Sequence, residues 1–225
     1  GIVVFPRKER LQRHLGVAVV GVAVGERKLG ALGDNVDEFG GRELGEVEAA
    51  TRTNCQILDI EADDMAALDA LERLYTLGDA YADLIRILER KLKLAETSEA
   101  RREILGKQAF MYEEEIKDPD KAVAAYQSLL QEGGDDLDTL RALDRLYEGG
   151  ERWSDLAGIL PRELALVAAE EGKTLVELKL RLGRVRQERL GDIDGAIAAY
   201  ADALELEPLD ETARAALEGL LSETA

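Results

Sequence analysis

Two stretches that lie 72 residues apart decide the fold. Residues 68–75 read LDALERLY and residues 140–147 read LRALDRLY, so six of their eight positions are identical. The same offset continues downstream, where it pairs Gly78 with Gly150 and then leucine with leucine. Similarity of a chain to itself at a fixed period is typical of repeat architectures, in which each unit is covered by the next. We therefore predict a repeated block of about seventy residues.

A second pair of segments indicates the same block. DPDKAVAAYQSLLQ begins at Asp118 and DIDGAIAAYADALE begins at Asp192, an offset of 74 that a two-residue insertion in the intervening loop would produce. A weaker third copy, EVEAATRTNCQIL, begins at Glu46. The block then holds four helices, arranged as two pairs of about thirty-five residues each.

Apolar residues at spacings of three and four indicate that these segments are helical. The clearest stripe follows Asp192 and consists of Ala196, Ile197, Tyr200, Ala203 and Leu204. We expect Gly78, and in the second copy Gly149-Gly150, to supply the left-handed residue that ends two of the helices, and Pro161 to kink or break another. The predicted helices span about 64–77, 80–95, 98–117, 119–132, 136–148, 152–169, 172–190, 193–206 and 210–222.

Acidic residues precede several of these helices in pairs: Asp63-Asp64, Asp135-Asp136 and Asp192 with Asp194. Such pairs could indicate a calcium-binding loop, but none is followed by the central glycine and terminal glutamate that the loop requires. A carboxylate at a helix start can accept hydrogen bonds from the first backbone N–H groups. We therefore predict that these acids cap helices.

The stretch GDIDGAIAAYADALELEP, from Gly191 to Pro208, resembles the second helix of a tetratricopeptide repeat. It has the Gly-Asp turn, a small residue at Ala196, an aromatic at Tyr200 and the closing proline, and the likeness covers about residues 44–225. The resemblance implies an all-α, right-handed solenoid of antiparallel helix pairs, a tetratricopeptide-like superhelix with about four pairs plus a C-terminal helix. It also implies that the first helix of each pair lines a concave groove for peptides or partner proteins.

The repeat does not extend over the whole chain. We expect residues 1–43 to form a degenerate or poorly ordered N-terminal segment and residues 44–225 to form the repeat array. The final segment copies only the first helix of a new pair, with the apolar stripe Ala213, Ala216, Leu217, Leu220 and Leu221. Since the chain also starts with glycine, we expect it to be part of a longer array, and the alternative is that the last helix is a solvating cap.

Composition excludes several classes of function. Forty-seven acidic residues against 29 basic ones give a net charge of -18, which repels nucleic acid and anionic lipid. The longest apolar stretch, Leu15–Val24, has ten residues, whereas a membrane-spanning helix needs about twenty. One cysteine, Cys55, and one histidine, His14, cannot make a zinc site. We therefore expect no nucleic acid partner, no membrane insertion, no metal and no cofactor.

The residues do not assemble a catalytic constellation. Cysteine–histidine chemistry needs a base beside the nucleophile, but Cys55 and His14 lie far apart in the sequence. We interpret His14 as a surface residue and Cys55 as a passive, half-buried or surface residue, with a reactive thiol as the alternative. Tyr81 and Trp153 occupy equivalent positions in the repeat, so we assign both to packing between helices. We expect that the protein is not an enzyme.

A binding surface is the remaining candidate site. On the faces of the first helices that turn away from the apolar stripes we place Arg73, Phe110, Arg141, Arg145 and Arg184. Arginine and aromatic side chains dominate interface energetics, so a row of them could bind a carboxylate-bearing or acidic peptide. The alternative is that they are ordinary solvated residues, paired along the helix with Glu72, Asp144 or Glu148.

Two functions are compatible with these observations. The first is a non-catalytic protein–protein interaction scaffold that binds a peptide or partner segment in the groove of the repeat array. The second is a helical accessory region of a larger multidomain enzyme or regulator, with no binding activity of its own.

Overall fold

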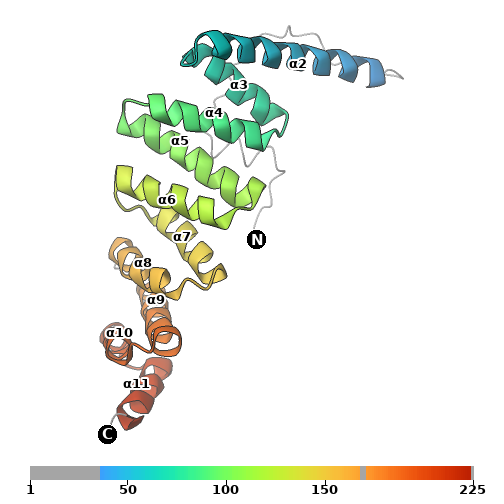
Figure 1. The fold of residues 1–225 in the computed structure, drawn as a ribbon. Helices are drawn as coiled ribbons and strands as arrows, with labels where there is room; N and C mark the ends of the chain where they lie inside the picture. The colour runs from blue at the N-terminus through green and yellow to red at the C-terminus, as the bar shows by residue number, and fades with distance from the viewer. Residues whose placement is uncertain (1–35, 168–170, 224–225) are drawn as a thin grey trace. The chain divides into compact units, whose positions relative to one another are not determined.

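The computed structural model describes residues 36–167 and 171–223, and all regular secondary structure within these residues is helical (Figure 1). His14 and most of the N-terminal segment that we expected to be poorly ordered lie outside the described residues. The chain divides into two compact units, the first ending at Asp118 and the second starting at Pro119. We describe each unit by itself.

The first unit is a run of antiparallel helices in which each helix packs on the next. It contains α2 (Val36–Ile60), α3 (Met65–Leu77), α4 (Tyr81–Leu94) and α5 (Ser98–Phe110), and α5 continues as the π-helical segment η1 (Met111–Ile116). A core forms where α2, α3 and α4 meet, because their apolar stripes face one another: Leu58, Ala67, Leu68, Leu71 and Ile87. α2 begins at Val36, upstream of the boundary expected at residue 44.

The second unit repeats this arrangement. It contains α6 (Pro119–Gly133), α7 (Leu137–Gly149), α8 (Trp153–Leu166), α9 (Gly172–Arg184) with its π-helical continuation η2 (Val185–Leu190), α10 (Ile193–Leu206) and α11 (Glu211–Glu223). One core lies between α6 and α9 and a second between α9 and α11. The predicted all-α fold of stacked antiparallel helix pairs is confirmed within each unit. From here on, the first helices are α3, α5, α7, α9 and α11, and the second helices are α2, α4, α6, α8 and α10.

The predicted caps are confirmed at three helix starts. Asp64 accepts a hydrogen bond from the Ala67 N–H at 2.7 Å, and Asp136 accepts one from the Thr139 N–H at 2.9 Å. Asp192 accepts one from the Gly195 N–H at 3.0 Å. These bonds satisfy N–H groups that have no partner inside the helix.

The prediction that glycine supplies the left-handed residue after α3 and α7 is wrong. Gly78 and Gly150 have φ angles of -89° and -91°, and the left-handed residues are the next ones, Asp79 at 52° and Glu151 at 53°. Each glycine directly follows the last helical residue, and its N–H still bonds to the carbonyl four residues back, at 3.0 Å in both copies. A Cβ at residue 150 would lie 3.2 Å from the Leu146 carbonyl oxygen, a tight contact that favours glycine there.

Pro161 does not break α8, so that alternative is wrong. The helix runs without interruption from Trp153 to Leu166 although proline lacks the backbone N–H that would bond one turn back. Pro161 lies on the exposed side, whereas its neighbours Ile159 and Leu160 are buried in the core. Packing of the apolar face therefore holds the helix together across the missing bond.

Tyr200, Tyr126 and Trp153 pack as predicted, whereas packing of Tyr81 between helices stays a prediction. Tyr200 is 2% exposed, and Tyr126 and Trp153 pack against the core between α6 and α9. The Arg189 guanidinium lies 4.7 Å from the centre of the Trp153 ring, which adds a cation–π contact between η2 and α8. The Tyr81 hydroxyl donates to Asp79 at 2.7 Å, in the turn before α4.

The last helix only partly follows its predicted stripe. Ala213 and Leu220 of α11 are buried, and Ala216 and Leu217 are half-buried. Leu221, expected in the same stripe, is 56% exposed; among the described residues α11 packs mainly on α10.

Candidate partner-binding surface

All five residues predicted for the groove lie on first helices. Arg73 on α3, Arg145 on α7 and Arg184 on α9 are exposed, whereas Phe110 on α5 and Arg141 on α7 are half-buried. The first unit holds Arg73 and Phe110, and the second unit holds the three arginines from 141 onward. A single row of all five residues stays a prediction.

In the second unit, Arg181 joins two consecutive first helices. From α9 its guanidinium binds both carboxylate oxygens of Asp144 on α7, with 2.6 Å between Nη2 and Oδ1, and it donates to Glu148 at 2.9 Å. Asp144 is 7% exposed. Burial lowers the pKa of Arg181, but the hydrogen bonds and charge of Asp144 outweigh burial, so the pKa is raised. A partly buried, bidentate ion pair of this kind fixes the spacing of α7 and α9.

Beside this contact, the second helix α8 contributes a buried carboxylate. Glu163 is 3% exposed, and its Oε1 accepts a long bond of 3.4 Å from Arg141 Nε. Among the described residues its Oε2 has no hydrogen-bond partner. Burial raises the pKa of Glu163, and the nearby charge of Asp144 raises it further, against smaller opposing effects of Arg141 and Arg181.

The first unit contains an equivalent cluster. Lys107 on α5 donates to Glu72 on α3 at 2.7 Å, which joins these two first helices. Lys91, on the second helix α4, donates both to Glu72 and, at 2.6 Å, to Asp69. Burial raises the pKa of Glu72, but the hydrogen bonds from Lys107 and Lys91 outweigh it and hold the pKa below its usual value.

The two clusters correspond position by position. The repeat offsets of 72 and 74 carry Asp69, Glu72, Lys91 and Lys107 onto Arg141, Asp144, Glu163 and Arg181. We call these two sets the first and second quartets. In the quartets, the bases that bind Glu72, Asp144 and Glu148 come from neighbouring helices. Pairing of the predicted groove arginines along their own helices stays an alternative. Sequence reasoning missed the quartets although the offsets could have aligned them.

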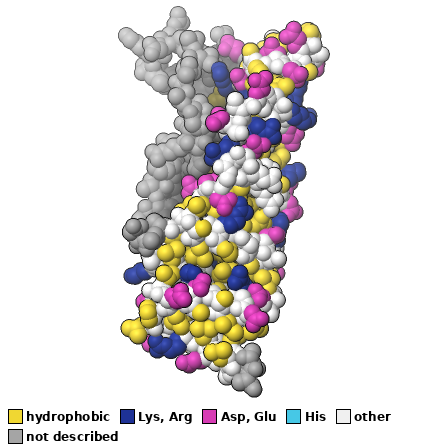
Figure 2. Space-filling model, turned by 90° about the vertical axis from the view of Figure 1, so that its left-hand side faces the viewer, with side chains coloured by type: hydrophobic (Ala, Val, Ile, Leu, Met, Phe, Trp, Pro, Cys, Tyr) yellow, Lys and Arg dark blue, Asp and Glu magenta, His cyan; other side chains and the backbone are white. Residues whose placement is uncertain are grey.

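The face shown in Figure 2 mixes acidic and basic side chains and has no large area of one sign. Hydrophobic side chains gather in the lower part of that view. Large apolar side chains are exposed around the last helices, namely Leu190, Leu206, Leu209 and Leu221.

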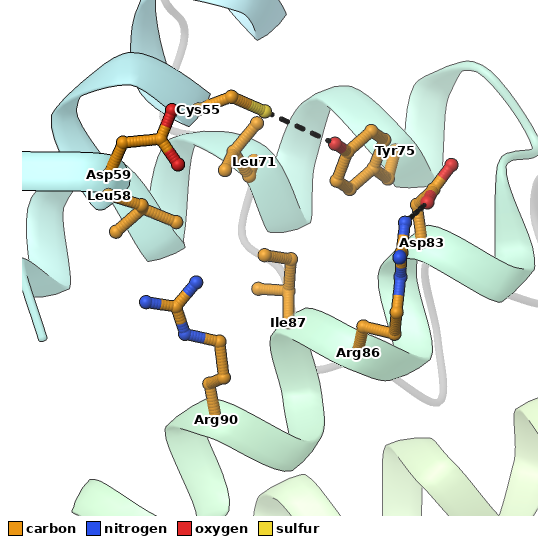
Figure 3. A pocket seen from close by; sticks show the side chains of 9 residues that line it. All are labelled: Cys55, Leu58, Asp59, Leu71, Tyr75, Asp83, Arg86, Ile87 and Arg90. Atoms are coloured by element: carbon orange, nitrogen blue, oxygen red, sulfur yellow. Dashed lines mark hydrogen bonds and ion pairs between the residues drawn. The ribbon is translucent and has the colours of Figure 1, made fainter. Parts of the chain in front are cut away.

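A small pocket of about 250 Å³ lies between α2, α3 and α4 (Figure 3). Cys55 is half-buried, as predicted, and its Sγ lies 3.6 Å from the Tyr75 hydroxyl. The same repeat positions in the second unit hold Gln127 and Tyr147, joined by a 2.7 Å hydrogen bond. Burial and Cys55 raise the pKa of Tyr75 to about 12. The pocket exists where the shorter cysteine replaces a glutamine, so we interpret it as a packing feature.

Within the part of the chain that the structure describes, no three histidine, cysteine or acidic side chains are grouped so that they could hold a metal ion. None of the described helices is both long and apolar enough to cross a bilayer.

Comparison with known proteins identifies the repeat. A tetratricopeptide-repeat family model matches residues 107–132 and 177–210, which are the equivalent parts of the two blocks. The chain is a tetratricopeptide-like helical repeat protein. No curated protein matches it significantly in sequence.

Solved structures of other helical proteins are similar to this chain. The structure of Naa15/Naa10 bound to HypK-THB matches with a TM-score of 0.54 and 19% identity, over 81% of this chain and 27% of the other, so the match spans about a quarter of that longer protein. That likeness shows the fold. MamA matches with a TM-score of 0.42 and 17% identity over 67% of this chain and 76% of its own. YrrB, described as a tetratricopeptide protein with an unusual peptide-binding site, matches with a TM-score of 0.40 and 12% identity over 79% and 86%.

Proposed function

We propose that this tetratricopeptide-like protein is a non-catalytic interaction scaffold that binds a peptide or partner segment along its first helices. The repeats support a scaffold as the general class. One observation supports the location. Because Arg181 on α9 binds Asp144 and Glu148 on α7, these two first helices lie side by side, with the exposed Arg145 and Arg184 next to the bridge.

The chemistry of this surface favours a carboxylate-bearing segment. Arg145 follows Asp144 directly in the chain, and Arg184 lies one turn beyond Arg181. A guanidinium binds a carboxylate through two parallel hydrogen bonds, which gives both affinity and orientation. The net charge of -18 repels an acidic partner at long range, so close contacts with these arginines must supply the binding free energy. In the first unit, Arg73 and Phe110 flank the Glu72–Lys107 bridge in the same way.

The test is a binding titration with the full chain. The probe is a fluorescein-labelled, glutamate-rich peptide with a free carboxyl terminus, followed by fluorescence anisotropy. We expect saturable binding that weakens with added salt, and at least about a tenfold weaker affinity for Arg145→Glu/Arg184→Glu, because each lost charged hydrogen bond contributes about 1.5–3 kcal/mol.

The matched control is Arg52→Glu/Lys93→Glu, which makes the same change in charge at exposed positions on the second helices α2 and α4. Its affinity is expected to stay within about threefold of that of the unaltered chain, because only long-range charge changes. Equal loss of affinity in both double variants would show that net charge, not the first-helix surface, governs binding. If the acidic peptide and a lysine-rich peptide of equal length both fail to bind, the accessory-region alternative is favoured instead.

A further inference from the structure

The helix pairs α3–α4 and α7–α8 are nearly interchangeable in their apolar contacts. Eight leucines at equivalent positions in the two pairs are at most 2% exposed: Leu68 and Leu140, Leu71 and Leu143, Leu84 and Leu156, Leu88 and Leu160. Hydrophobic burial is not directional and depends mainly on area. These contacts therefore do not distinguish α4 from α8 as the partner of α3.

The ion pair between the two helices does distinguish them, because its polarity is reversed: the acid and the base lie on opposite helices in the two units. In the first unit the second helix carries the base, and Lys91 donates to Asp69 at 2.6 Å. In the second unit the second helix carries the acid, and Glu163 accepts from Arg141 at 3.4 Å. The other two members keep their sign, with Glu72 or Asp144 bound by a base from the next first helix.

Charge counting shows what an exchange of second helices would do. With all side chains ionised, each quartet holds two acids and two bases and is neutral. If α8 replaced α4 against α3, Glu163 would take the place of Lys91, and three acids facing one base would leave a charge of -2. If α4 replaced α8 against α7, three bases facing one acid would leave +2.

These like charges would meet at a contact that is partly removed from water. The side chains of Lys91 and Glu163 are 12% and 4% exposed, and those of their partners Asp69 and Arg141 are 45% and 43% exposed. Like charges brought together at such a contact repel each other, and natural interfaces use such repulsion to reject wrong partners.

We propose that the reversed polarity of the 69–91 and 141–163 ion pairs makes each first helix select its own second helix, so that the two near-identical hairpins do not exchange helices within or between copies of the chain. Exchange of identical elements is a known route to unwanted dimers in proteins with repeated hairpins. The quartets therefore distinguish α4 from α8 as the partner of α3, which the leucine contacts do not.

The test removes the difference in polarity while leaving native pairing neutral. In the variant Asp69→Arg/Lys91→Glu, both hairpins carry the base on the first helix and the acid on the second helix. The native and the exchanged quartets are then all neutral. The full chain is unfolded in urea and refolded at increasing concentration and mildly alkaline pH, which favours ionised carboxylates. Size-exclusion chromatography with light scattering measures the fraction of dimers and larger species. We expect several times more of these species than for the unaltered chain.

A four-fold variant provides the matched control. Asp69→Arg/Lys91→Glu/Arg141→Asp/Glu163→Lys reverses both pairs, so exchanged quartets again carry a charge of two units, and clean refolding is expected to return. If this variant refolds as poorly as the double variant, the proposal is wrong, because the substitutions themselves then cause the defect. Equally clean refolding of the double variant and the unaltered chain also overturns it. Should Asp69→Arg/Lys91→Glu fail to fold, Arg141→Asp/Glu163→Lys makes the same test with the polarity of the first hairpin.

Discussion

Gly183 on α9 lies directly against the ring of Tyr200 on α10. A Cβ at residue 183 would come 2.6 Å from Cε1 of that ring, and Tyr200 is 2% exposed, so the ring has little room to move. We expect Gly183→Ala to lower the free energy of unfolding by about 1–3 kcal/mol, since overpacking outweighs the gain in helix propensity. Urea denaturation followed by circular dichroism measures the change.

Gly158 on α8 is the control for this prediction. A Cβ there has no atom within 4 Å, so the helix propensity of alanine acts alone. We expect Gly158→Ala to raise the free energy of unfolding by about 0.5–1 kcal/mol. Stabilisation by both substitutions would show that Tyr200 does not pack as the structure has it.

Lys117 holds a left-handed backbone conformation that suits glycine. Its φ is 60° at the end of η1, and the equivalent residue after η2 is Gly191 with a φ of 66°. Because a side chain strains this conformation, we expect Lys117→Gly to stabilise the protein by about 0.5–1 kcal/mol and Gly191→Ala to destabilise it by about 1 kcal/mol. Thermal unfolding of the two variants checks the opposite signs, and shifts of the same sign would contradict the equivalence of the two turns.

Arg181 should contribute far more to the stability of the fold than an ordinary basic side chain on the surface does. Arg181→Ala leaves the buried carboxylate of Asp144 without its bidentate partner and removes a compensating positive charge near Glu163. We expect the free energy of unfolding to fall by about 2–3 kcal/mol. Lys179→Ala breaks a pair whose acid, Asp202, is 54% exposed, and should cost less than about 1 kcal/mol. Equal losses of unfolding free energy for the two variants in urea denaturation would contradict this structural role of Arg181.

Glu163 should make stability depend on pH in the direction opposite to most carboxylates. Its pKa is raised in the folded protein, so the folded state binds this proton more tightly than the unfolded state and stability falls as the pH rises through the folded pKa. Glu163→Gln, which retains an acceptor for Arg141 and cannot ionise, should therefore be more stable than the unaltered chain at neutral pH. The difference should shrink as the pH falls toward the usual range of a glutamate.

The comparison variant is Glu148→Gln, which alters an exposed carboxylate bound by the same Arg181. Its stability relative to the unaltered chain should change little across this pH range, since exposed pairs contribute little. The midpoint urea concentrations of unfolding, measured across that pH range for both variants, test this prediction. A stability gain for Glu163→Gln that is constant with pH would contradict the role given to ionisation.

Much of the fold could be predicted because its signals are local. Apolar stripes and capping acids such as Asp64 and Asp136 define helix bodies and starts without reference to distant residues. Turn geometry was predicted less well: glycine is the usual left-handed residue, yet Asp79 and Glu151 take that conformation. Their position depends on how far α3 and α7 continue before the next helix packs against them.

The repeat offsets align the positions of the two quartets but do not show which of these residues touch one another. Lys91 and Glu163 lie on second helices, and only packing brings them to Asp69 and Arg141 on the first helices. Arg73, Arg145 and Arg184 could be placed on exposed faces from spacing alone. Their neighbours, the bridges formed by Lys107 and Arg181, required the structure.

Hydrogen–deuterium exchange of the full chain, with and without saturating glutamate-rich peptide, tests most directly whether the first helices form the binding surface. The account predicts that bound peptide slows exchange in α7 and α9, around Arg145 and Arg184, and leaves α8 and α10 unchanged. Protection confined to α8 and α10, or no protection at a peptide concentration that saturates the anisotropy signal, would contradict it.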